Sequence, residues 1–146
     1  LEAKEWPAIA SASFKVKLSH LILYSNIISS EGMIYFAKAA RQETMILLTH
    51  FDISDNAIET QGMKILASVL IYMPNLRQLQ LKKNYIGEEG AMYLANAAWG
   101  QALTHLKLLD IADNAIEKGG MEKIASVLKY LPKLNELHIS GNRIGD

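Results

Sequence analysis

Two spacings of hydrophobic residues alternate along the chain, and the stretch Leu76–Leu94 contains both. It begins as L-x-x-L-x-L, in which apolar and polar residues alternate as in a short strand with one buried face. After Asn84 the spacing changes, and Gly90, Leu94 and Ala98 lie on one stripe of a helix. The stretch therefore predicts a strand, a turn at the asparagine and a helix.

The same pattern recurs along the chain, each time around an asparagine. The five asparagines are Asn26, Asn56, Asn84, Asn114 and Asn142. Their spacings are 30, 28, 30 and 28 residues, so the repeating unit is a pair of coils 58 residues long. Residues 51–88 and 109–146 agree at 20 of 38 positions. A fixed period of this length is typical of a solenoid, in which successive coils stack on one another.

We interpret the whole chain, residues 1–146, as one domain of about five repeats. The expected boundaries are 14–43, 44–73, 74–101, 102–131 and 132–146, after a remnant of a preceding coil at 1–13. The chain begins at Leu1 and stops within a repeat, and we expect it to be a piece of a longer protein.

Composition narrows the classes of function. Lys plus Arg and Asp plus Glu number 15 each, so no global charge attracts nucleic acid or anionic membrane. The absence of cysteine excludes disulfides and thiolate sites and fits a reducing, cytoplasmic location. No apolar run is long enough to span a bilayer. Phosphate-loop, dinucleotide-binding and zinc-protease motifs are absent, so we expect no cofactor, no metal and no catalytic residue.

The pattern L-x-x-L-x-L-x-x-N-x-I-G-x-x-G-x-x-x-L resembles the leucine-rich repeat, in the long form of the ribonuclease inhibitor family. The resemblance covers residues 14 to 146 and implies a right-handed α/β solenoid shaped as a horseshoe arc. Proteins with this form include ribonuclease inhibitors, Ran GTPase-activating proteins and the sensor arms of NOD-like receptors. Mammalian ribonuclease inhibitors are rich in cysteine, and its absence here argues against identity with that inhibitor.

Elementary geometry also predicts a curved stack. Neighbouring strands lie about 4.8 Å apart, whereas packed helices need about 8–10 Å, so the strands must line the inner, concave side. We expect the asparagine amides to pair backbone groups of the bend, and replacement of Asn84 or Asn114 by leucine to cost about 1–3 kcal/mol. The glycines at 32, 62, 90 and 120 are expected to let each helix start close to the strand layer.

The residues between the core leucines alternate onto the concave face, and we predict that they contact a partner protein. The predicted contact residues are His20, Tyr24, His50, Asp52, Ser54, Gln78, Gln80, Lys82, Asp110, Glu136 and His138. Their neighbours in the same rows are Ile22, Leu108, Ala112 and Ser140. This mixture of aromatic, apolar and oppositely charged residues is typical of a binding surface, against the alternative of a merely solvated sheet face.

Two chemical alternatives arise on this face. His20, His50 and Asp52 are of types that ligate metals, although no short ligand motif supports a site. Asp110 and His138 share a row, but Ser140 lies about 6.6 Å along the strand from His138, too far for a nucleophile and its base.

A third alternative concerns charge. The basic residues Arg77, Lys82, Lys83 and Lys107 are predicted to form a local cluster. No aromatic platform interleaves them and three aspartates flank them, so an acidic protein partner suits the cluster better than nucleic acid.

The leading prediction is therefore a protein-interaction module. The alternative is a regulator of a small GTPase, as the resemblance to Ran GTPase-activating proteins implies, with Lys83, Tyr85 and Arg143 as candidate rim residues. Weak self-association through the open ends of the stack is a further expectation.

Overall fold

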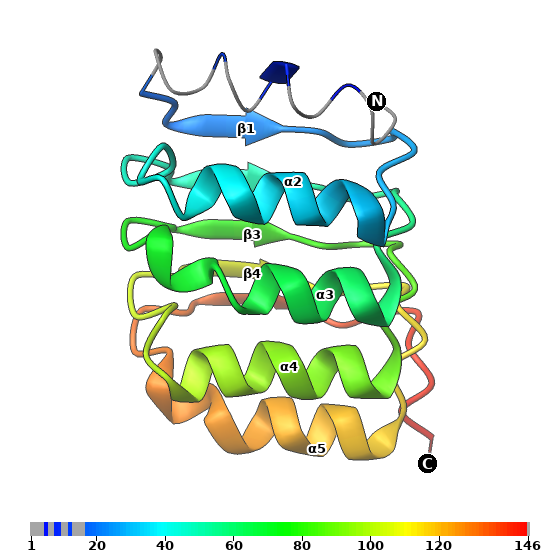
Figure 1. Ribbon diagram of the computed structural model, residues 1–146. Helices are drawn as coiled ribbons and strands as arrows, with labels where there is room; N and C mark the ends of the chain where they lie inside the picture. The colour runs from blue at the N-terminus through cyan, green and yellow to red at the C-terminus, as the bar shows by residue number, and fades with distance from the viewer. Residues whose placement is uncertain (1–4, 6–7, 10–11, 13–16, 146) are drawn as a thin grey trace.

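The computed structural model describes Glu5, Ala8, Ile9, Ala12 and residues 17–145, and the coils stack in chain order (Figure 1). The strands are β1 (His20–Ile22), β2 (His50–Asp52), β3 (Gln78–Gln80), β4 (Leu108–Asp110) and β5 (Glu136–His138). The helices are α2 (Ser30–Ala40), α3 (Glu59–Ala67), α4 (Gly87–Trp99) and α5 (Lys118–Val127), with short 3-10 turns η2 (Leu70–Tyr72) and η3 (Leu128–Tyr130). Of the expected remnant at 1–13, only Glu5, Ala8, Ile9 and Ala12 lie within the described residues.

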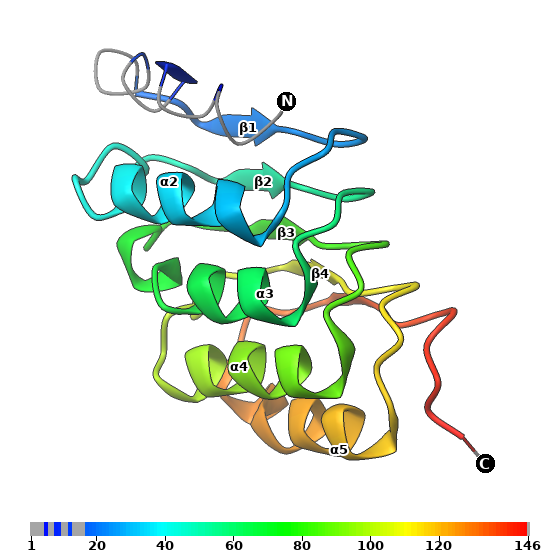
Figure 2. The ribbon, with the colours of Figure 1, turned by 45° about the vertical axis from the view of Figure 1, so that its right-hand side comes forward.

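The five strands of the described part of the chain form one parallel sheet in the order β1-β2-β3-β4-β5. The helices α2 to α5 lie on one side of the sheet and spread over a wider arc than the strands, as Figures 1 and 2 show. The strands therefore line the inner side of the curve, as the two spacings require. This arrangement confirms the predicted fold class, whereas the repeat boundaries stay predictions.

The core lies between the two layers and is made by the residues at the repeat's apolar positions. Phe36 of α2 and Phe51 of β2 are fully buried and stack with ring centroids 4.8 Å apart. Leu79 and Leu109 occupy the position of Phe51 in the next two strands and are equally buried. In β5 the corresponding Leu137 is only half-buried, because no described coil lies beyond it.

The asparagine amides bond backbone groups in the bend after each strand. Asn56 Nδ2 donates to the carbonyl of Ile53 in its own coil and of Leu23 in the coil before. Asn114 does the same with Ala112 and Leu81, at 2.9 and 2.8 Å. Each of these asparagines therefore joins two coils by donating hydrogen bonds to buried backbone carbonyls of both.

The residue before each asparagine has a left-handed backbone, a feature that the sequence pattern does not reveal. The five residues are Ser25, Asp55, Lys83, Asp113 and Gly141, with φ between 54° and 69°. A left-handed residue other than glycine costs roughly 1–2 kcal/mol. The left-handed conformation turns the chain from the strand toward the helix and directs the asparagine side chain into the core, where its hydrogen bonds offset the cost.

Three of the repeat glycines lie against the preceding helix, and the expectation that they let each helix start close to the strand layer stays a prediction. Around Gly62, Gly90 and Gly120 the nearest atoms beyond the same coil belong to the preceding helix. A β-carbon on Gly90 would lie 3.4 Å from the Cβ of Met63, and one on Gly120 would lie 3.1 Å from that of Ala91. These glycines therefore set the distance between neighbouring helices.

Candidate protein-binding face

The strand register brings the residues expected on the concave face into straight rows. The first row is His20, His50, Gln78, Leu108 and Glu136, and the second is Ile22, Asp52, Gln80, Asp110 and His138. Tyr24, Ser54 and Lys82 come two positions later, where the strands end. The structure thus assembles the predicted set on one face, and the role of that set in binding stays a prediction.

The apolar part of this face lies on the first coil. Ile22 is 67% exposed and Tyr24 is 59% exposed, so both present large side chains to solvent. Tyr24 lines a hollow of about 170 Å³ together with Ser54, Asp55, Lys82 and Lys83. Ser54 is only 7% exposed and offers a partner little surface.

Asp52 and Asp110 have a structural task in addition to their predicted contact. Asp52 Oδ1 accepts the backbone N–H of Ser54 at 2.9 Å, and Asp110 Oδ1 accepts that of Ala112 at 3.0 Å. These bonds hold the backbone where each strand ends, so substitution of either aspartate would disturb the coil as well as the surface.

The imidazole rings of His20 and His50 stack across the first two strands, with centroids 4.0 Å apart and planes at 12°. The Thr49 hydroxyl donates to the Ser19 carbonyl, so its oxygen accepts a hydrogen bond from His50 Nδ1 at 2.7 Å. Among the described residues no three His, Asp or Glu side chains converge as metal ligands. The stacked pair forms a polar, aromatic part of the surface.

The stability of this region should depend on pH through His50. Burial, then His20, then Arg77 lower the pKa of His50 below its ordinary value of 6.5. The unfolded chain then binds more protons than the folded one below that value, so folding stability is full above it and falls as the pH drops. We expect His50→Gln to flatten the decline in unfolding free energy between about pH 7 and pH 5, measured by urea titration. A decline as steep as in the wild type would assign the effect to other groups.

The arrangement of Asp110, His138 and Ser140 does not suit nucleophilic catalysis. His138 Nδ1 faces Asp110 Oδ2 at 3.5 Å, and its Nε2 faces Glu136 Oε2 at 3.9 Å. Both ring nitrogens are directed at carboxylates, which leaves neither placed to activate the Ser140 hydroxyl. The histidine instead joins two acidic groups at the last two strands.

The predicted single basic cluster is wrong, because its members lie at opposite ends of the strands. Arg77 and Lys107 immediately precede β3 and β4, whereas Lys82 and Lys83 follow β3. Arg77 and Lys82 are five residue steps apart on an extended chain, which is about 16 Å. Lys82 Nζ also lies 3.6 Å from Asp113 Oδ2, so the lysine forms an ion pair within the chain.

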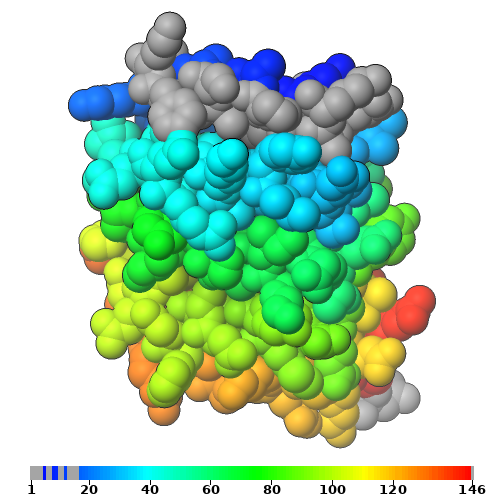
Figure 3. All heavy atoms as spheres, in the orientation of Figure 1, coloured from blue at the N-terminus to red at the C-terminus, as the bar shows by residue number. Residues whose placement is uncertain are grey.

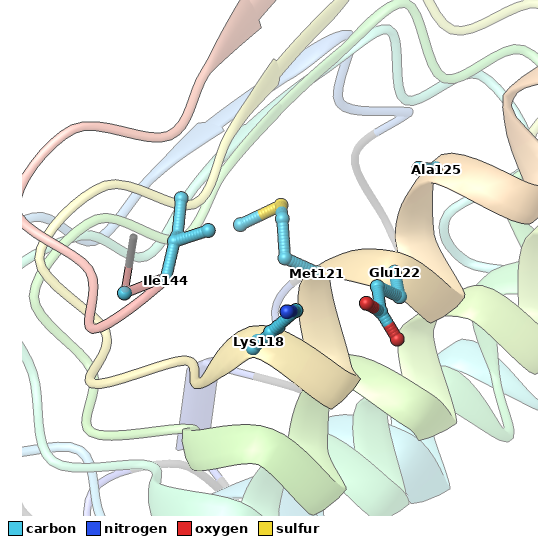
Figure 4. A pocket seen from close by; sticks show the side chains of 6 residues that line it. Lys118, Met121, Glu122, Ala125 and Ile144 are labelled. Atoms are coloured by element: carbon cyan, nitrogen blue, oxygen red, sulfur yellow. The ribbon is translucent and has the colours of Figure 1, made fainter.

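A second hollow, of about 360 Å³, lies at the end of the stack between α5 and the final residues. Figure 4 shows Met121 and Ile144 turned toward one another beside it. The equivalent residues one coil earlier, Ala91 and Ile116, are buried, and α5 covers Ala91 through Gly120. The hollow therefore lies where a further coil would pack against α5, and we do not interpret it as a ligand site.

Comparison with known proteins supports this view of the fold. The Leucine Rich repeat family model matches residues 45–67, 72–95, 102–125 and 130–146, more than half of the chain. The chain belongs to the leucine-rich repeat family. Within it, the long repeats and the relatives below place it in the ribonuclease-inhibitor-like type.

Relatives of this leucine-rich repeat chain carry different names. Porcine ribonuclease inhibitor (Sus scrofa) is 26% identical over 88% of the chain, and human NACHT, LRR and PYD domains-containing protein 12 is 28% identical over 88%. Mouse Tonsoku-like protein is 37% identical over 45% of the chain. The matched regions are 28%, 12% and 5% of these proteins, so the chain spans only a small part of their length.

Leucine-rich repeat domains generally mediate protein–protein interaction. None of the helices in the described part of the chain has the length and apolar character needed to cross a membrane.

Proposed function

We propose that the chain is a protein-recognition module, without catalytic activity of its own, whose concave sheet face binds a partner protein. The observation that carries this proposal is the exposure of Ile22 and Tyr24 beside the hollow that Lys82 and Lys83 line. Large apolar and aromatic side chains flanked by polar groups are the usual anchors of protein interfaces. The porcine relative is named as an inhibitor of ribonuclease, which fits a binding function of this kind.

A variant of the first coil tests the proposal. Tyr24→Ala with Ile22→Ser removes the exposed apolar surface and leaves the backbone bonds of Asp52 and Asp110 intact. We expect its affinity for a partner captured with the wild-type chain to fall at least about tenfold, because buried aromatic anchors dominate such interfaces. Isothermal calorimetry with the purified partner measures the change.

The matched control is Ile34→Ser on α2, which alters a residue 56% exposed on the opposite, helical side. It should bind as the wild type does. If the control weakens binding and the first-coil variant does not, the partner uses the helical side and the concave-face proposal fails.

Regulation of a small GTPase is the second candidate. It rests on Lys83, Tyr85 and Arg143, which are exposed on the rim that follows the strands, Tyr85 to 68%. A cation and an aromatic side chain held at a rim could reach a bound GTPase.

Self-association through the end of the stack is a further proposal. Met121 and Ile144 leave apolar surface uncovered beside the end hollow. A second copy stacked there would bury this surface, so the mean mass from light scattering should rise with concentration, and Met121→Lys should abolish the rise. A constant monomer mass at millimolar concentration would contradict the proposal.

A further inference from the structure

A third hollow lies away from the concave face, at the edge where helices end and strands begin. This edge is on the left in Figures 1 and 3. The hollow has a volume of about 180 Å³ and is lined by Glu43, Ile46, Ile71, Tyr72 and Pro74. We call it the turn-edge hollow.

The walls of the turn-edge hollow are apolar, exposed and held together. Ile46 is 43% exposed, Ile71 55% and Tyr72 39%, and the adjacent Leu47 is 46% exposed. Asn75 Nδ2 donates to the Ile46 carbonyl at 2.8 Å, which ties the turn before β2 to the turn before β3. The hollow therefore lies between two neighbouring coils that this hydrogen bond joins.

The chain contains its own comparison for this surface, 58 residues later. The turn before β4 repeats the backbone of the turn before β2: Leu48 N–H bonds the Met45 carbonyl, and Leu106 N–H bonds the Leu103 carbonyl, both at 3.0 Å. Likewise η3 repeats η2. The backbone turns are thus matched between the two copies.

The exposed residues are not matched. The substitutions between the first copy and the second are Glu43 to Gln101, Ile46 to Thr104, Leu47 to His105 and Ile71 to Lys129. The second copy forms the same turns with polar residues at these positions, so the turns do not require the three aliphatic residues. Contiguous exposed apolar surface that the fold does not need is characteristic of an interaction site.

Charge and size indicate the occupant. The Glu43 carboxylate has no hydrogen-bond or ion-pair partner among the described residues. The guanidinium of Arg41, two residues earlier, donates a hydrogen bond to Ser68 Oγ at 3.4 Å. A cation on the occupant would meet Glu43. The volume is below the about 300 Å³ of small-molecule sites, and it suits a single large side chain.

We propose that the turn-edge hollow binds a segment of a partner protein that inserts one bulky aliphatic side chain and places a Lys or Arg beside it, against Glu43. This contact is independent of the concave face, because its residues lie in the turns and those of the concave face lie in and after the strands. The two surfaces would allow the module to hold two protein segments at once.

Four labelled peptides on one short scaffold test the proposal: Leu with Lys, Leu with Glu, Ser with Lys, and Ser with Glu. We expect the Leu–Lys peptide to bind the full chain best by fluorescence anisotropy. The triple variant I46T/L47H/I71K, which carries the residues of the second copy, should weaken its binding at least about tenfold. E43Q should weaken it severalfold and remove most of its salt dependence.

Two control variants change exposed residues outside the hollow. Ile34→Thr, on α2, and Tyr24→Ala, on the concave face, should leave Leu–Lys binding unchanged, and all variants should keep the wild-type urea midpoint. Several results would overturn the proposal: no peptide bound at millimolar concentration, equal binding by the triple variant, or equal binding of the Leu–Lys and Leu–Glu peptides. Wild-type dimerisation lost in the triple variant, or wild-type binding to phosphatidylcholine vesicles, would also overturn it in favour of a second copy or a membrane.

Discussion

Replacing Asn114 by leucine is expected to destabilise the fold by about 3 kcal/mol, because the change leaves buried N–H groups without an acceptor. Asn114 Oδ1 accepts the backbone N–H of Asn84 at 2.9 Å and that of Ile86 at 3.4 Å. No other acceptor for either group is recorded among the described residues. Unpaired buried N–H groups are rarer in proteins than under-paired carbonyls, which marks their higher cost.

Asn84→Leu provides the matched comparison and should cost about 1 kcal/mol or less. Asn84 Nδ2 donates to the carbonyls of Ile53, Leu81 and Lys82. Each carbonyl also has a second donor: Asn56 Nδ2 at 2.9 Å, Asn114 Nδ2 at 2.8 Å and the Asp55 N–H at 2.8 Å, respectively. Asn84 Oδ1 is itself buried without a partner, so leucine removes an unpaired acceptor.

Urea unfolding of the two variants measures the difference. Native-state hydrogen exchange should show faster exchange of the Asn84 and Ile86 amides in Asn114→Leu only. Equal losses of unfolding free energy in the two variants would mean that the asparagines contribute through side-chain packing and not through their individual hydrogen bonds.

The sequence pattern predicted the architecture because all five repeats place apolar residues at the same positions of a strand and a helix. The alternation around Leu79 and the helical spacing from Gly90 each recur in the other repeats. Because the same positions match in every repeat, the pattern cannot be a coincidence of one segment. The strand register then follows, because coils with the same sequence pattern stack with their equivalent residues side by side. The rows on the concave face were predictable for the same reason.

The pattern missed details that its apolar positions do not record. The left-handed backbone at Lys83 is one example, because lysine gives no local signal for it. The separation of Arg77 from Lys82 is another, because closeness in sequence becomes distance along an extended strand. The exposed Ile46 and Ile71 could have been found by comparing the two 58-residue copies at their variable positions instead of their shared ones.

The helix-to-helix spacing gives the second large expected effect. Gly120→Ala should destabilise the fold by about 1–2 kcal/mol, because forcing atoms into a packed contact costs more than alanine gains in helix propensity. The new Cβ would lie 3.1 Å from the Cβ of Ala91, 3.1 Å from the carbonyl oxygen of Glu88 and 2.9 Å from Ile116 Cγ2. A backbone oxygen cannot move aside without shifting the whole of α4.

The adjacent Gly119 should respond with the opposite sign. The three atoms nearest to its new Cβ all belong to the Glu88 carboxylate, the first at 2.8 Å, and that half-exposed side chain can swing into solvent. Gly119→Ala should therefore keep most of the helix-propensity gain, about 0.5–1 kcal/mol. Thermal and urea unfolding of the two variants compare the same substitution at neighbouring positions of one helical turn. If both variants are stabilised, α4 and α5 have room between them, and the glycine does not set the distance between coils.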